Sequence, residues 1–144
     1  MLEYTVRADS IDARGSLAVC KDASMIIDTD MSGREDAFNP AELLLAALAG
    51  CLIKGIERAL PLLKFSLSGV TVEVHATRQD APPRIAEITY RIAVDTEESD
   101  HRIDLLHRNA RKYGTISNTL AGAVLLEGTM VRGTELSAAG SEDR

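Results

Sequence analysis

Residues 39–53 read NPAELLLAALAGCLI, a helix start followed by a long apolar run. Asn39 is a favourable N-cap residue, and Pro40 suits the first position of a helix. Glu42 stands three residues after Asn39, where its side chain can return to the backbone of the cap, as in a capping box. The stretch therefore predicts a helix whose first residue is Pro40.

This helix is expected to continue to about Leu60 and to end at Pro61, because proline disrupts a helix interior. Between Leu43 and Ile53 its surface is apolar on every side, so most of that surface must be buried. A chain of 144 residues has few elements with which to surround such a helix. We expect a homodimer in which a second copy covers the exposed flank. The alternative is a monomer that wraps the helix with its own sheet and second helix.

Short strands are expected before this helix. They are Leu2–Ala8, Gly15–Cys20 and Met25–Thr29, with turns at Asp9–Ser10 and Lys21–Asp22 and a polar loop from Asp30 to Phe38. Two longer strands, Val70–Arg78 and Ile85–Asp95, follow the helix and are joined by a turn at Pro82–Pro83. This part of the chain therefore supplies the sheets.

A second helix is expected from its cap at Ser99 to about Tyr113, and Gly114 stops it as a left-handed C′ residue. A short helical turn then begins at Ser117, and Ala123–Val131 forms the last strand. This order predicts an α+β fold in a single domain over residues 1–132. Residues 133–144 are small and polar and are expected to form a disordered tail.

Composition excludes several classes of partner. The net charge is −6 and no basic cluster is present, which argues against binding to nucleic acid or to an anionic membrane. The longest uncharged apolar run, Leu43–Ile53, is too short to span a bilayer, and the N-terminus does not resemble a signal peptide. The cysteines are Cys20 and Cys51, too few for a disulfide framework, so we expect a reducing, cytoplasmic location. The histidines show no ligand spacing, so neither a metal nor a cofactor is expected.

Two segments resemble the signatures of the OsmC/Ohr (organic-hydroperoxide resistance) family. Residues 39–52 resemble its helix motif, in which the peroxidatic cysteine corresponds to Cys51. Residues 112–120 read KYGTISNTL and resemble the second motif, a Lys/His-x-Cys-Pro-Val-Ser-like segment that carries the resolving cysteine. Gly114 occupies that resolving position. The order of predicted elements follows the family over nearly the whole chain.

The resemblance implies an intertwined homodimer with antiparallel sheets around a buried central helix and with active sites at the subunit interface. It also implies that an arginine of an early strand and a glutamate near the helix start frame Cys51. Arg14 falls at the position of that arginine. Glu42 lies one residue later than the glutamate of the well-studied peroxidases, where this chain has Ala41, and one residue rotates a side chain by about 100° on a helix.

Each of these residues also has a purely structural interpretation. Cys51 has the alternative of a small buried hydrophobe, Arg14 that of a solvated strand residue, and Glu42 that of a helix cap. Cys20 is expected to be a strand core residue. It lies about 20 Å from Arg14 along an extended strand, so we expect it to be far from the site and unable to resolve Cys51.

The leading interpretation is a one-cysteine, thiol-dependent hydroperoxide reductase of the oxidative stress response. Cys51 would become a sulfenic acid, Arg14 would stabilise its thiolate, and Glu42 would hold Arg14. The reductant would be an external thiol, because position 114 carries no sulfur. One alternative is a non-catalytic dimer that binds a small apolar ligand in a degenerate pocket. A third interpretation is a structural dimer with a vestigial pocket.

Overall fold

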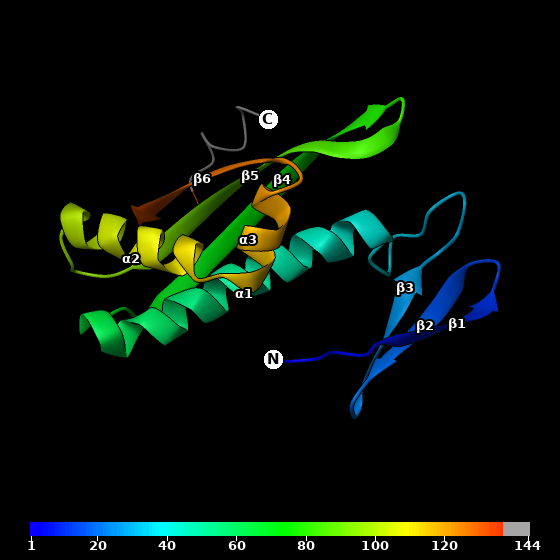
Figure 1. Ribbon diagram of the computed structural model, residues 1–144, viewed down its shortest axis with the longest axis horizontal. Coiled ribbons are helices and arrows are strands. Elements are labelled where there is room, and N and C mark those ends of the chain that lie inside the picture. The colour runs from blue at the N-terminus through cyan, green and yellow to red at the C-terminus, as the bar shows by residue number, and fades with distance from the viewer. Residues whose placement is uncertain (137–144) are drawn as a thin grey trace. The chain divides into compact units, whose positions relative to one another are not determined.

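The computed structural model describes residues 1–136 and shows a mixed α+β fold, as the sequence predicts (Figure 1). The elements in chain order are β1 (Arg7–Asp12), β2 (Gly15–Cys20), β3 (Ala23–Asp28), α1 (Pro40–Leu63), β4 (Gly69–Asp80), β5 (Pro83–Asp95), α2 (Asp100–Lys112), α3 (Thr115–Ala121) and β6 (Leu125–Arg132). The chain divides into two compact units, Met1–Leu44 and Leu45–Arg144. The single domain over residues 1–132 stays a prediction, and residues 137–144 of the expected tail lie outside the described part.

The first unit contains an antiparallel sheet in the order β1-β2-β3. The predicted strand Gly15–Cys20 is confirmed as β2. The prediction for β1 was wrong, because this strand continues through the expected turn at Asp9–Ser10. The chain instead turns after Asp12, whose Oδ1 accepts hydrogen bonds from the backbone N–H groups of Arg14 (2.8 Å) and Gly15 (3.1 Å). An aspartate that bonds the backbone two residues ahead favours a turn at that point.

The start of α1 is the capping box that the sequence predicts. The Glu42 backbone N–H donates to Asn39 Oδ1 (2.8 Å), and the Asn39 N–H donates to Glu42 Oε1 (2.9 Å). These two bonds satisfy donors that a helix start otherwise leaves without partners. The local sequence therefore determines this end of the helix.

The predicted end of α1 was wrong, because the helix passes Pro61 and stops at Leu63. Lys64 adopts a left-handed conformation with φ +51°. The backbone N–H of Phe65 then donates to the carbonyl of Leu60 (2.9 Å), as in a Schellman motif. Pro61 is tolerated because it lies in the last turn, and the reversal at Lys64 ends the helix.

The second unit packs its helices on one face of a sheet (Figure 1). The core combines apolar residues of α1, α2 and the central strand β5: Leu48, Leu52, Ile56, Ala59, Ile88, Tyr90, Ile92, Val94, Ile103, Leu106 and Ala110. The strand order is β4-β5-β6. The strands β4 and β5 form an antiparallel hairpin, whereas β6 is parallel to β5. The expectation of purely antiparallel sheets was therefore wrong for β6, because α2 and α3 form a crossover between β5 and β6.

The helix α1 buries only one of its faces in the single chain. Its buried residues are Leu48, Leu52, Gly55, Ile56 and Ala59. Ala46, Gly50 and Ile53 follow one another at spacings of four and three residues, share the opposite face and are exposed. Ile53 is 37% exposed. The chain alone thus does not bury the helix on all sides.

Candidate active site

A close crossing of α1 and α2 positions the site. Gly55 lies against Ala110, and a Cβ at residue 55 would be 3.1 Å from the Ala110 carbonyl oxygen. Arg58 of α1 donates to Asn109 Oδ1 of α2 (2.7 Å), and its guanidinium lies 4.8 Å from the centre of the Tyr113 ring. A glycine at the crossing lets the two backbones approach each other more closely than larger residues allow.

Cys51 lies four residues before Gly55 in α1, and Gly114 lies four residues after Ala110. Cys51 and Gly114 are close to each other. A Cβ at residue 114 would lie 3.2 Å from Cys51 Sγ and 2.9 Å from Ser117 Oγ. The structure therefore places the sulfur beside the backbone of the residue that the sequence analysis assigned to the resolving position. The Cys51 sulfur and the Ser117 hydroxyl thus both border the position where Gly114 has no side chain.

The predicted conformation of Gly114 was wrong. Its φ is −83° and its ψ is 121°, an extended conformation that any residue can adopt, and it forms the N-cap of α3 rather than a left-handed C′ residue. The requirement for glycine is steric instead. A side chain at this buried position would meet the sulfur, the Ser117 hydroxyl and the carbonyl oxygen of Ala110 at 3.3 Å. The sequence pattern alone did not distinguish these two reasons for a glycine.

The two cysteines occupy different units of the chain. Cys51 is partly buried in α1, and Cys20 ends β2 in the first unit; both are free thiols. The expected distance between Cys20 and the site stays a prediction. Within the second unit, the sulfur of Cys51 is the only cysteine sulfur that the sequence provides.

Sequence reasoning missed Ser117 as a site residue. Its side chain is fully buried, and its Oγ has no hydrogen-bond partner among the described residues. The signal was its place in the segment 112–120, where a polar residue stands three positions after Gly114 on a short helix. Only the tertiary packing shows that this hydroxyl and the sulfur border the same position beside residue 114.

Arg14 lies in the turn between β1 and β2 rather than within a strand, and its side chain is 62% exposed. Its Nε donates to Asp30 Oδ2 (2.9 Å), and this hydrogen bond lowers the pKa of Asp30. A second arginine that sequence reasoning missed, Arg34, donates to the Arg14 carbonyl oxygen (3.3 Å). Its hydrogen bonds to Asp36 lower the pKa of that carboxyl to about 2. This corner therefore contains two paired arginines.

Glu42 serves as the helix cap described above. Arg14 forms its ion pair with Asp30. Within this chain Asp30 therefore holds Arg14, which was the role expected of Glu42. Arg14 and Glu42 belong to the first unit and Cys51 to the second. The approach of either residue to Cys51 stays a prediction.

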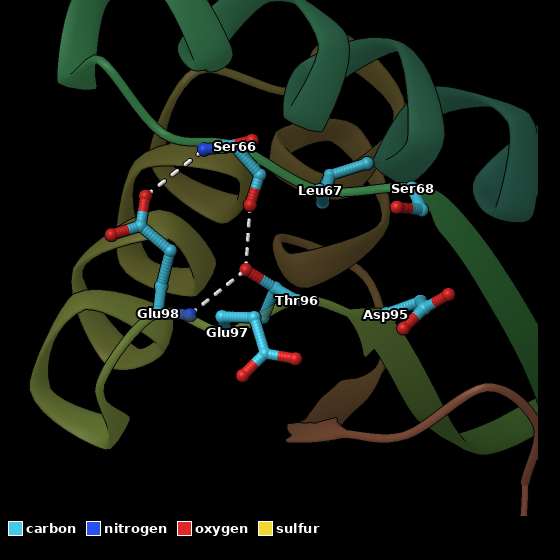
Figure 2. Close-up of a pocket in the computed structure, with 7 residues that line it drawn as sticks. All are labelled: Ser66, Leu67, Ser68, Asp95, Thr96, Glu97 and Glu98. Carbon is cyan, nitrogen blue, oxygen red and sulfur yellow. Dashed lines mark hydrogen bonds between the residues drawn. The ribbon is translucent and has the colours of Figure 1, made fainter.

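A separate depression lies between the loop that joins α1 to β4 and the loop that follows β5. It has a volume of about 370 Å³ and is lined by Ser66–Ser68 and Asp95–Glu98 (Figure 2). Its polar groups bond to one another: Thr96 Oγ1 donates to the Ser66 carbonyl oxygen (2.5 Å), and the Ser66 N–H donates to Glu98 Oε2 (2.9 Å). Arg102 also donates to Glu98 (3.0 Å) and lowers its pKa. These contacts connect the α1–β4 loop with the β5–α2 loop.

Residues 1–136 contain no group of three or more His, Cys, Asp or Glu side chains that could hold a metal ion. Within the same range, no helix has the length and apolar character needed to cross a membrane.

Comparison with known proteins gives one sequence match and several structural matches. The model of the OsmC-like protein family matches residues 33–127. The chain is similar to an OsmC-like protein of Mycoplasma pneumoniae, with 19% identity, a TM-score of 0.79, and coverage of 90% of this chain and 98% of that one. It is also similar to an organic hydroperoxide resistance protein OsmC of Legionella pneumophila, with 19% identity, a TM-score of 0.73, and coverage of 92% of this chain and 98% of that one. A further similar structure is the organic hydroperoxide resistance protein OhrB of Bacillus subtilis, with 15% identity, a TM-score of 0.67, and coverage of 90% of this chain and 98% of that one. No curated protein matches the chain in sequence.

Proposed function

Because the chain belongs to the OsmC-like protein family, we propose that it is a one-cysteine, thiol-dependent reductase of organic hydroperoxides. Two of the similar solved structures are named as organic hydroperoxide resistance proteins, which supports this class of substrate. The observation that carries the proposal is the surroundings of Cys51. Its partly buried sulfur lies beside Gly114, and no second thiol is present in its unit.

The proposed reaction has two stages. The Cys51 thiolate attacks the distal oxygen of the hydroperoxide, so that an S–O bond forms and the O–O bond breaks. The departing alkoxide takes up a proton to give the alcohol, and Cys51 becomes a sulfenic acid. An external thiol then displaces water to form a mixed disulfide, and a second thiol releases Cys51 and leaves as the external disulfide. A reducing cytoplasm would supply these thiols.

Arg14 is the proposed cation of the site. A guanidinium near Cys51 would stabilise the thiolate and the departing alkoxide. Its Nε is paired with Asp30, which leaves the other nitrogens of an exposed side chain available for contacts. Glu42 is engaged in the helix cap, and Asp30 rather than Glu42 is the proposed partner of Arg14.

The experiment follows hydroperoxide consumption with a monothiol reductant. Cys51→Ser should abolish turnover, because serine cannot replace the thiolate as the nucleophile. The matched control is Cys20→Ser, which removes the other thiol and should retain wild-type turnover. If Cys51→Ser keeps the wild-type rate, Cys51 is not the nucleophile. If no variant and no wild-type protein consumes hydroperoxide, the non-catalytic apolar-ligand alternative replaces this proposal.

A homodimer is proposed as the working form. The exposed face of α1 carries Ala46, Gly50 and Ile53, small and apolar residues that suit close contact with another helix. A second copy would bury this face and complete the coverage of the helix. Light scattering at micromolar concentration should show twice the mass of the chain.

The variant Ile53→Asp should shift that mass towards the monomer, because it places a charge within the proposed contact. Lys54→Glu changes charge at the neighbouring exposed position and serves as its control. A monomeric wild-type protein would refute the dimer.

A further inference from the structure

One hydroxyl of the second unit lacks a partner although it is fully buried. Ser117 is 0% exposed, and its Oγ makes no hydrogen bond with the described residues. Other hydroxyls nearby behave normally: Thr119 Oγ1 of the same helix donates to the Thr115 carbonyl oxygen at 2.8 Å. A buried polar group without a partner is uncommon in folded proteins and raises their free energy. A functional partner that is absent from the resting protein would explain it.

The position of this hydroxyl identifies the partner. Ser117 Oγ and Cys51 Sγ lie 2.9 Å and 3.2 Å from the same point, the place where a Cβ of residue 114 would be. Both atoms therefore border the position that Gly114 leaves without side-chain atoms. No hydrogen bond between them is formed in the reduced protein. An oxygen atom attached to the sulfur on the side of residue 114 would come within reach of this hydroxyl.

On the premise that Cys51 reduces hydroperoxides, we propose that Ser117 is the hydrogen-bond donor to the oxygen atom that Cys51 takes up. In this step the thiol and the hydroperoxide give the sulfenic acid and the alcohol: the S–O bond forms, the O–O bond breaks, and the thiol proton goes to the alkoxide. The Ser117 hydroxyl keeps its own proton. Its Oγ–H points to the sulfenic oxygen and thereby gains the partner that it lacks in the reduced state.

This contact has a consequence for a one-cysteine cycle. With no thiol at residue 114, the sulfenic acid persists until an external thiol reaches it, and a second hydroperoxide can convert it to a sulfinic acid. A donor at the sulfenic oxygen withdraws electron density from the sulfur and slows that second attack. Ser117 thus protects the intermediate whose lifetime Gly114 prolongs.

The test compares wild type with Ser117→Ala and uses Thr119→Ala as the matched control, because it removes an exposed hydroxyl from the same helix. Each reduced protein receives an excess of tert-butyl hydroperoxide, and a dimedone quench at successive times reports the sulfenic acid on Cys51 by mass spectrometry. Ser117→Ala should shorten the lifetime of the sulfenic acid about fivefold, as expected for the loss of one hydrogen bond between neutral groups. It should also increase the yield of sulfinic acid. Thr119→Ala should match the wild type.

The outcomes separate the two proposals. Equal lifetimes in wild type and Ser117→Ala would overturn the role of Ser117 and leave the reductase proposal intact. A wild-type protein that forms no sulfenic acid on Cys51 would overturn both.

Thermal unfolding of the reduced proteins adds a readout that is independent of oxidation. Ser117→Ala should melt at the same or a higher temperature, because it removes an unpartnered buried hydroxyl. A lower melting temperature would show that the hydroxyl has a structural partner in the reduced protein, and this would overturn the inference.

Discussion

A Cβ atom at Gly114 would lie 3.2 Å from the sulfur of Cys51. In a disulfide the Cβ of one cysteine lies about 3 Å from the sulfur of the other, because the S–S bond is about 2.05 Å long. Residue 114 therefore has nearly the position that a disulfide partner of Cys51 requires. Its extended backbone conformation also accepts a side chain without left-handed strain.

Gly114→Cys should therefore form a disulfide with Cys51 on oxidation. It should also raise turnover with a dithiol reductant, which we expect to be weak or absent in the wild type. A neighbouring thiol traps the sulfenic acid at high effective concentration, and the resulting disulfide is the form that a dithiol reduces. The Ser117 hydroxyl, 2.9 Å from the new Cβ, must rotate away, which lowers the melting temperature. Peptide mapping and hydroperoxide consumption measure the two effects.

Gly114→Ser is the control for this change, because it has a similar size and no thiol. Fast dithiol-dependent turnover by the wild type, with no gain in Gly114→Cys, would show that the absence of a resolving cysteine does not limit the cycle.

Glu42→Gln should leave both stability and turnover close to the wild-type values. The amide oxygen of glutamine can accept the Asn39 N–H in place of Glu42 Oε1, and Asp30 already supplies the negative charge that pairs with Arg14. Glu42→Ala removes the cap acceptor and should lower the free energy of unfolding by about 1 kcal/mol. Denaturant unfolding and turnover are measured together. Loss of turnover in Glu42→Gln at unchanged stability would assign the carboxylate charge to the site.

Stability should fall as the pH decreases below 6.5, the ordinary pKa of histidine, because of His107. Burial and then the charge of Arg111 lower the pKa of His107, while Asp104 opposes them. Its Nε2 is bonded to the hydroxyl of Tyr90. Since the lowered pKa means that the folded protein takes up this proton only at a lower pH than the unfolded chain does, stability is unaffected above the unfolded-state pKa and falls as the pH drops below it. The slope from this group is at most about 1.4 kcal/mol per pH unit.

Unfolding midpoints between about pH 8 and about pH 5 measure this effect. His107→Gln should reduce the loss of stability over that range, whereas His101→Gln, an exposed change on the same helix, should keep the wild-type slope. An unchanged slope in His107→Gln would exclude His107 as its cause.

Gly128→Ala should destabilise the protein by about 1–3 kcal/mol, the usual cost of overpacking. A Cβ at residue 128 would lie 2.3 Å from three atoms of the Tyr90 ring. Tyr90 is 1% exposed, and its hydroxyl is bonded to His107, so the ring has little room to move. Gly122→Ala is the control, because its Cβ would approach other atoms only to 3.6 Å and its backbone is helical. Thermal unfolding should show a loss for the first variant and none for the second.

The sequence by itself determined the features that depend on neighbours within one turn of helix or one strand. The capping box of Asn39 and Glu42 and the Ser99 cap, whose side chain accepts the Arg102 N–H, follow from polar groups three residues apart. The strand Gly15–Cys20 likewise has its predicted bounds. Such groups meet whenever the local backbone forms, so their spacing along the chain is enough to predict them.

Tertiary structure alone decided the parallel pairing of β6, the steric role of Gly114 and the position of Ser117 beside Cys51. Each depends on how segments distant in sequence pack, above all on the close crossing of α1 and α2 at Gly55 and Ala110. An extended Gly114 and a left-handed Gly114 are equally compatible with the local pattern that ends a helix. The backbone angles of residue 114 exclude the left-handed form, and its distances to the sulfur and the hydroxyl supply the steric reason for a glycine. Contacts between different helices are encoded by neither segment separately.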